Sequence, residues 1–210
     1  QTVGADDRTV NGTELPVDIE LERFEFEGEP AVRLPVPTQK GDVETLSRQL
    51  EEALQFDAGT GLLKRAAFFE QAAAHASQTL KAGLRALVFV EPDRLSALEG
   101  DLGALATEDL LEAVGEQLHS LLQAGDTAGR VTSRGFALLV ERGNTRDLDA
   151  WLGRVLQRMA EHLFHVGERS VSVTCSAGAT LLSSHGEVLQ APLESSIKAA
   201  RAAAAAGGNR

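Results

Sequence analysis

The stretch Leu84-Arg-Ala-Leu-Val-Phe-Val90 decides the fold class of this chain, because it is an almost continuous apolar run. A short run of this kind is typical of a strand that is buried on both faces of a sheet. Phe136–Val140 is a second apolar run, and in residues 171–179 apolar and small side chains alternate with Ser and Thr. The three segments predict a buried central sheet in the second part of the chain.

The segments between these predicted strands have the spacing of amphipathic helices. Apolar residues recur three and four positions apart in residues 68–80, 110–122 and 148–163. A fourth helix is predicted at Ile197–Ala206, where alanine, a strong helix former, predominates before two glycines. Helices and strands that alternate in this way predict an α/β or α+β domain in which helices cover one sheet.

The first 37 residues show the alternation of β-strands. Apolar side chains occupy every second position at Val17, Ile19 and Leu21, and again at Val32 and Leu34. We expect two or three antiparallel strands here. So few strands are not stable alone and need a partner surface.

Residues 38–56 are predicted to form a helical linker. Its apolar residues are spaced by three and four and are flanked by charged side chains: Val43, Leu46, Leu50 and Leu54. This narrow stripe is the pattern of a short coiled-coil seam, through which two copies of the chain would form a homodimer. The stripe could instead pack against its own domain, and the sequence leaves both interpretations open.

Composition limits the classes of function. The 210 residues (22.3 kDa) carry a formal net charge of −11, so the basic field needed for nucleic-acid binding is missing and no such binding is expected. No apolar run approaches the roughly 18–20 residues of a membrane span, and no membrane insertion is expected. The single cysteine, Cys175, cannot form an internal disulfide, which favours a cytoplasmic location. The five histidines show no metal-ligand spacing.

Three motifs carry a resemblance to a known family. Asp57-Ala-Gly-Thr-Gly-Leu-Leu-Lys-Arg65 resembles the D-x-L-T-G-L-x-N-R signature that opens GGDEF domains, the family of diguanylate cyclases. Val173-Thr-Cys-Ser-Ala-Gly178 is similar to its V-T-x-S-x-G strand, and Gly207-Gly-Asn-Arg210 to its closing G-R-N-R. The resemblance covers residues 57–210. It implies an α+β palm-type fold related to nucleotide cyclases, with a mostly antiparallel central sheet flanked by helices.

Residues 1–37 in turn resemble the C-terminal strands of a PAS sensor domain, on the stretch from Asn11 to Leu21. The implied order is the end of a PAS-like domain, a linker at residues 38–56 and a GGDEF domain at residues 57–210. Proteins of this order often continue into an EAL domain, and a regulator of type IV pili has such an arrangement with a degenerate GGDEF domain. An EAL-type neighbour and partners in pilus, twitching-motility or biofilm regulation are accordingly expected.

Three glutamates stand where the family binds its metal and its guanine base. Glu91 aligns with the metal-ligand Asp at the end of the first central strand and keeps a carboxylate on a longer side chain. Glu99 replaces an Asn that contacts guanine, so that an amide becomes an acceptor only. Glu108 stands at the second guanine contact, which is normally Asp. The resemblance makes these positions vestigial metal and nucleotide positions.

The hairpin motif departs furthest from the family. The positions of G-G-D/E-E-F are occupied by Thr132, Ser133, Arg134, Gly135 and Phe136. The guanidinium of Arg134 replaces a metal-binding carboxylate and would repel Mg²⁺ instead of holding it. The product-inhibition motif R-x-x-D is degenerate as well, because it begins at Gln123 and keeps only Asp126.

These replacements lead to the prediction that the domain is not an enzyme and has no cofactor or metal. We expect a degenerate GGDEF-like module of a bacterial cyclic-di-GMP signalling protein that dimerises and relays a signal, or acts as a scaffold, to its neighbour. The alternative is a GTP-binding allosteric module that regulates an attached cyclic-di-GMP phosphodiesterase, and an active diguanylate cyclase is the third candidate. The arginines around the hairpin fit either an anion pocket or, as we favour, a solvated turn paired with carboxylates: Arg130, Arg134, Arg142 and Arg146.

Overall fold

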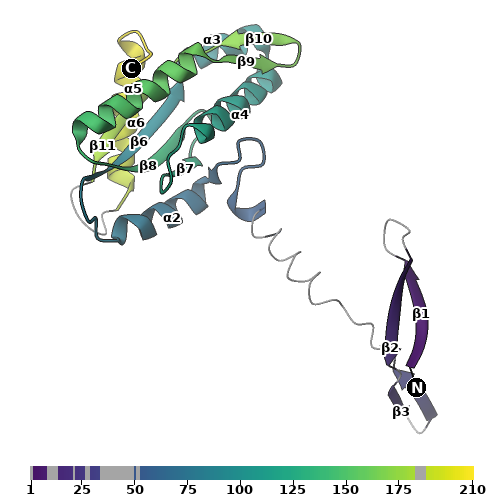
Figure 1. Ribbon diagram of the computed structural model, residues 1–210. Helices are drawn as coiled ribbons and strands as arrows, with labels where there is room; N and C mark the ends of the chain where they lie inside the picture. The colour runs from purple at the N-terminus through teal and green to yellow at the C-terminus, as the bar shows by residue number, and fades with distance from the viewer. Residues whose placement is uncertain are drawn as a thin grey trace. The chain divides into compact units, whose positions relative to one another are not determined.

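The computed structural model describes residues 2–8, 14–20, 22–26, 29–33, 50, 53–182 and 188–210 (Figure 1). The chain divides into two compact units, residues 1–50 and 51–210.

The first unit consists, in its described part, of two antiparallel ribbons. β1 (Thr2–Arg8) pairs with β2 (Glu14–Glu20), and β3 (Glu22–Phe26) pairs with β4 (Glu29–Arg33). The antiparallel pairing agrees with the alternation of the sequence, although four strands are present where two or three were expected. Of the residues that carried the strand and PAS-like predictions, Asn11, Leu21 and Leu34 lie outside the described residues.

A five-stranded sheet forms the centre of the second unit, with the strand order β11, β6, β8, β7, β5. β6 (Leu84–Pro92) pairs antiparallel with β11 (Cys175–Leu181) on one side and with β8 (Phe136–Arg142) on the other. β7 (Thr127–Arg130) is antiparallel to β8, and β5 (Leu63–Lys64) lies parallel to β7. The first apolar run is therefore a central strand, as predicted, and the mixed α/β fold class is confirmed.

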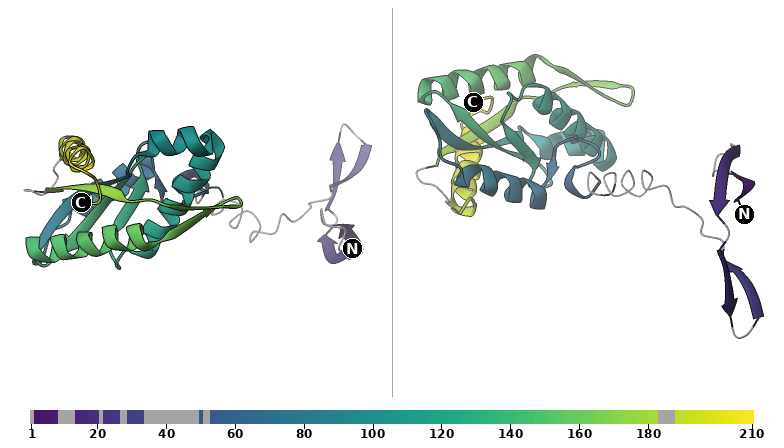
Figure 2. Two further views of the ribbon diagram at one scale, coloured as in Figure 1. Left: turned by 90° about the horizontal axis from the view of Figure 1, so that it is seen from above. Right: turned by 60° about the horizontal axis from the view of Figure 1, so that its bottom comes forward.

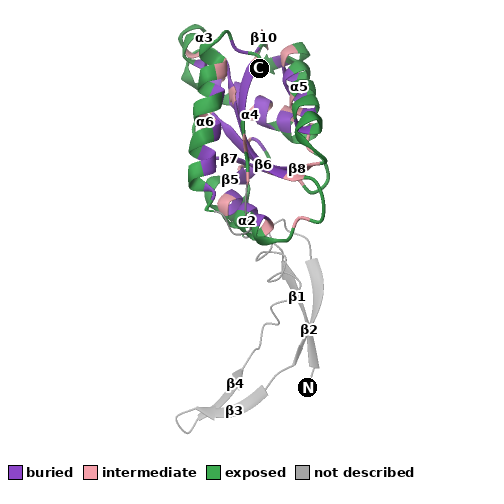
Figure 3. Ribbon diagram, turned by 90° about the vertical axis from the view of Figure 1, so that its left-hand side faces the viewer, coloured by how far each residue is buried: buried purple, intermediate pink, exposed green. Residues whose placement is uncertain are grey.

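Helices cover both faces of this sheet. In chain order they are α2 (Arg65–Ser77), α3 (Leu95–Leu102), α4 (Ala104–Ser120), α5 (Thr145–Glu161) and α6 (Gln190–Ala205). Successive side chains of β6 point to opposite faces, so Val88 packs in one core cluster with residues of α4 and α5, and Leu87 in a second with residues of α2 and α6. Figure 2 shows α5 and α6 on opposite sides of the sheet, and Figure 3 shows the buried strands between helices whose outer faces are exposed.

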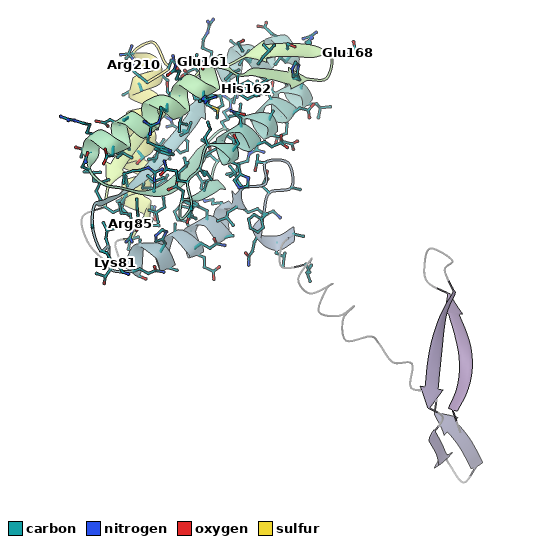
Figure 4. All side chains as sticks on the ribbon, in the orientation of Figure 1. Lys81, Arg85, Glu161, His162, Glu168 and Arg210 are labelled. Carbon is teal, nitrogen blue, oxygen red and sulfur yellow. The ribbon has the colours of Figure 1, made fainter. Side chains whose placement is uncertain are left out.

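The end of α5 differs from the sequence prediction. The helix stops at Glu161, and Leu163, which continues the helical spacing, begins β9 (Leu163–Val166) instead (Figure 4). β9 pairs antiparallel with β10 (Arg169–Ser172) across a turn in which Gly167 has a φ of 57°. Glycine adopts this left-handed conformation without a steric penalty. The pairing partner of β9 supplies backbone hydrogen bonds that a spacing rule cannot detect.

The third predicted strand is also shorter than its alternation suggested. Val171 belongs to β10, and β11 begins only at Cys175; just before it, the carbonyl of Thr174 accepts a hydrogen bond from the Asp93 amide at 2.8 Å. β11 then packs closely against α6. A Cβ at Gly178 would lie 2.1 Å from the Ser196 carbonyl oxygen, so only glycine permits this approach.

Candidate functional site

Two of the predicted site residues, Glu91 and Arg134, meet at the C-terminal end of β6, where the chain turns into α3. A depression of about 240 Å³ lies there, and its charged lining comprises Glu91, Asp93, Arg94, Arg134 and Arg201. A larger hollow of about 660 Å³ is mostly apolar and is lined by residues of α2 and α6. Of the predicted site residues it contains only Thr132. The charged side chains are therefore concentrated in the lining of the smaller depression.

Asp93 is the best-connected carboxylate of this region. Its side chain accepts hydrogen bonds from Thr174 Oγ1 at 2.7 Å, Ser176 Oγ at 2.6 Å and the Asn209 amide at 2.9 Å. The last contact requires Gly208, since a Cβ at that position (φ 76°) would lie 2.6 Å from Asp93 Oδ2. Asp93 thus joins the end of β6, the start of β11 and the residues that follow α6. This role of Asp93 was not predicted from the sequence, although the alternating hydroxyls of residues 172–176 and the Gly207-Gly208 pair are signals of it.

Arg134, from the turn between β7 and β8, bridges to α3. Its Nη2 lies 2.8 Å from Glu99 Oε2, and its Nη1 donates to Ser96 Oγ at 2.8 Å. The two charged side chains remain 40% and 43% exposed. The structure therefore brings together two predicted site positions, one from the hairpin motif and one from the expected base contact.

Arg130 makes the equivalent bridge to α4. Its Nη1 and Nη2 lie 2.5 and 2.9 Å from the two carboxylate oxygens of Glu108, and Nη2 also donates to the Ser133 carbonyl. The hydrogen bond from Arg130 lowers the pKa of the Glu108 carboxyl, and the same bond raises the pKa of Arg130. Glu108 is therefore held as an anion with a fixed orientation.

The hairpin that carries these arginines is anchored in the core. The amides of Val131 and Thr132 both donate to the Gly135 carbonyl, and Phe136 is fully buried. A Cβ at Gly135 would lie 2.2 Å from the ring of Phe89. Gly135 is required for packing against this ring, a reason that the aligned motif alone did not indicate.

The two predicted inhibitory-site positions are neighbours, but they contact protein groups. The backbone N–H of Gln123 donates to Asp126 Oδ2 at 2.9 Å. Both carboxylate oxygens of Asp126 also accept hydrogen bonds from Arg142, each at 2.8 Å. The guanidinium of Arg142 lies 4.2 Å from the centre of the Trp151 ring. Only 2% of the Asp126 side chain is exposed. Its carboxylate is committed to a buried ion pair.

A divalent metal does not fit the donors of the depression. Asp93 already accepts three hydrogen bonds, Glu91 contributes one carboxylate, and the cationic Arg134 belongs to the same lining. Within the described ranges, no group of three His, Cys, Asp or Glu side chains is placed to hold a metal ion. Cys175 offers no ligand either, because burial raises the pKa of its thiol to about 12.

Two further predictions concern exposed apolar surface and membranes. Leu50 and Leu54 of the predicted linker seam are 62% and 65% exposed, while Val43 and Leu46 lie outside the described residues.

No helix in the part of the chain that the structure describes has the length and apolar character needed to cross a bilayer.

Comparison with known proteins shows which family the region that contains the site matches. The family model "Diguanylate cyclase, GGDEF domain" matches residues 54–210. Cyclic di-GMP phosphodiesterase NbdA of Pseudomonas aeruginosa is 27% identical over 161 residues, which are 76% of this chain and 20% of NbdA. Diguanylate cyclase DgcP of the same organism is 27% identical over 184 residues, 83% of this chain and 27% of DgcP. The chain thus spans only about a fifth to a quarter of these relatives.

A solved structure supports the palm-type fold. The FimX GGDEF domain of Pseudomonas aeruginosa superimposes with a TM-score of 0.64 at 24% identity, covering 73% of this chain and 96% of that domain.

The prediction that the chain is not an enzyme is contradicted by these matches. The matching family model is that of an enzyme family, and DgcP is itself named a diguanylate cyclase. The replacements at the hairpin and at the three glutamates are features of this chain within that family. They do not remove it from an enzyme family.

Proposed function

This chain belongs to the GGDEF domain family of diguanylate cyclases, and from this premise we propose that it binds a guanine nucleotide and relays its occupancy to flanking segments in cyclic-di-GMP signalling. The observation that carries the proposal is the position of Asp93. This residue lines the depression and also binds the backbone of Asn209, at the end of the described chain. A ligand that moves the β6–α3 turn would therefore act on the C-terminal residues through one side chain.

The lining of the depression favours a phosphorylated ligand. Three arginines, Arg94, Arg134 and Arg201, outnumber the two carboxylates of the lining, and α3 begins at Leu95 in the same lining. The first amides of a helix have no intrahelical acceptor and form a positive end that suits phosphate. A volume of about 240 Å³ suits the phosphates of a nucleotide and leaves the base to the neighbouring α3 and α4.

The relay also needs a connection on the N-terminal side. The exposed side chains of Leu50 and Leu54 suit a seam with a second copy of the chain, which supports a homodimer. A PAS-like domain before this linker and an EAL-type domain after residue 210 would make the unit a connector between a sensor and a phosphodiesterase. Signalling partners in pilus or biofilm regulation belong to the same proposal.

Calorimetric titration of the chain with GTP, and separately with cyclic-di-GMP, tests the proposal. We expect GTP to bind near micromolar strength, about −8 kcal/mol, and to slow hydrogen exchange at the Asn209 amide. An Asp93→Asn variant, compared at equal GTP occupancy, should show a smaller change at Asn209, because its amide no longer matches all three donors. A folded sample that gives no heat with GTP would overturn nucleotide binding. Binding without any change at Asn209 would overturn the relay.

A further inference from the structure

We infer that the depression at the end of β6 binds the phosphates of a nucleotide without a divalent metal, through the guanidinium groups of Arg94, Arg134 and Arg201. This inference rests on the proposed binding of a guanine nucleotide at the same site. Its consequence is that Mg²⁺ should oppose binding, whereas at a site built of carboxylates Mg²⁺ would support it.

The cations of the depression come from three separate elements. Arg94 directly precedes α3, Arg134 lies in the turn between β7 and β8, and Arg201 lies on α6. The lining holds two carboxylates, Glu91 and Asp93, so its formal charge is positive. A positive site repels a divalent cation and attracts an anion. Guanidinium groups also match phosphate oxygens in geometry, because their planar N–H forks bind two oxygens at once.

Arg134 has donors to offer to such a ligand. A guanidinium carries five N–H groups and no acceptor. Among the described residues, Arg134 donates to Ser96 Oγ and Glu99 Oε2, each at 2.8 Å. The pair with Glu99 is 40% and 43% exposed, so water screens it and a phosphate can replace the carboxylate at small cost.

The two carboxylates of the lining do not make a metal site. Asp93 is 8% exposed, and its oxygens accept hydrogen bonds from Thr174, Ser176 and the Asn209 amide. A metal could bind Asp93 only at the expense of these contacts. Glu91, half-buried at the end of β6, is then one carboxylate alone, and its charge repels a phosphate. Glu91 should therefore weaken nucleotide binding, which is the reverse of the effect of a metal ligand.

The metal and the arginines would compete for the same oxygens of the nucleotide. Mg²⁺ bridges the β- and γ-phosphate oxygens of a nucleoside triphosphate and neutralises part of their charge. Guanidinium groups are attracted by that charge and bind those oxygens directly. The free triphosphate should therefore bind more tightly than its magnesium complex.

Calorimetric titration of the chain with GTP, once with EDTA and once with excess MgCl₂ at equal ionic strength, tests the inference. Equal ionic strength is needed because salt alone screens exposed charges. We expect tighter binding in EDTA by roughly tenfold, the scale of one hydrogen bond to a charged group.

Three variants give effects of opposite sign. Glu91→Gln should strengthen binding in EDTA, because it removes a repelling charge. Arg134→Gln should weaken binding in EDTA by roughly tenfold. Arg134→Glu should reverse the order of the two buffers, since two carboxylates of the lining would then be available to Mg²⁺. The control is Asp149→Asn, an exposed carboxylate of α5 outside the lining, which should change neither affinity. Circular dichroism verifies that each variant is folded.

The outcomes separate this inference from the proposed function. If GTP binds more tightly with Mg²⁺, or if Glu91→Gln weakens binding, the inference is overturned and nucleotide binding still stands. Equal affinity in the two buffers also counts against the inference, because the arginines would then not contact the oxygens that Mg²⁺ occupies. If GTP binds to the folded chain in neither buffer, the inference and the proposed function fail together.

Discussion

Two arginine–carboxylate pairs of similar geometry have opposite surroundings. Arg142 and Asp126 are 7% and 2% exposed, and Arg142 lies over the Trp151 ring, whereas Arg134 and Glu99 are 40% and 43% exposed and Arg134 lines the depression. Burial removes water from the first pair, so each charge depends on its partner. Water screens the second pair, which can exchange partners at small cost. The same chemistry therefore stabilises the fold in one place and remains available to a ligand in the other.

The largest effect is expected from breaking the buried pair. Asp126→Ala would leave the guanidinium of Arg142 uncompensated and is expected to lower the free energy of unfolding by about 3–5 kcal/mol. Urea denaturation followed by circular dichroism measures this change. Asp109→Ala, an exposed carboxylate of α4, is the control and should change stability by less than about 0.5 kcal/mol. Equal effects of the two variants would refute the assigned role of burial.

Asp93 is a third carboxylate, and its hydrogen-bond donors are neutral groups. Its removal should lower the free energy of unfolding by an intermediate amount. Asp93→Ala leaves the donors of Thr174, Ser176 and Asn209 without their acceptor, and a loss of about 2–3 kcal/mol is expected. Asp93→Asn keeps one acceptor oxygen and should lose less. Hydrogen exchange at Asn209 should accelerate in both variants. Unchanged exchange there would mean that Asp93 does not hold the C-terminal residues.

The central strands could be predicted from the sequence, whereas the contacts of the site could not. β6 and β8 are buried on both faces, so their composition alone identified them. The three partners of Asp93 lie 81, 83 and 116 positions away, and Glu99 lies 35 positions from Arg134, so no local pattern brings them together. The aligned motifs identified Arg134 and Glu99 as unusual residues. That the two side chains bind each other is a consequence of the tertiary fold.

The Glu108–Arg130 pair should give a smaller, pH-dependent effect. The folded-state pKa of Glu108 lies below its ordinary value of 4.5, so the pair stabilises the fold above the unfolded pKa and loses this contribution as the pH falls through the folded pKa. Glu108→Gln should therefore cost at most about 1 kcal/mol at pH 7, because Glu108 is 48% exposed. The difference from the unmodified chain should vanish in acid. A difference that persists below both pKa values would point to lost packing instead of lost charge.

The smallest change in stability is expected at the exposed pair of Arg134 and Glu99. A substitution there gives the sharpest test of the difference between the buried and the exposed pair. Arg134→Ala should alter the free energy of unfolding by less than about 0.5 kcal/mol, because solvent replaces both of its hydrogen bonds. The substitution should nevertheless weaken the binding of GTP, since Arg134 is among the residues that line the depression. Arg142→Ala should do the reverse, with a large loss of stability and no specific effect on GTP binding in the fraction that remains folded. If Arg134→Ala destabilised the fold by 2 kcal/mol or more, on the scale of a broken buried contact, the pair at the rim would be a structural tie like the buried one. Its exposure would then not mark it as a ligand-binding group.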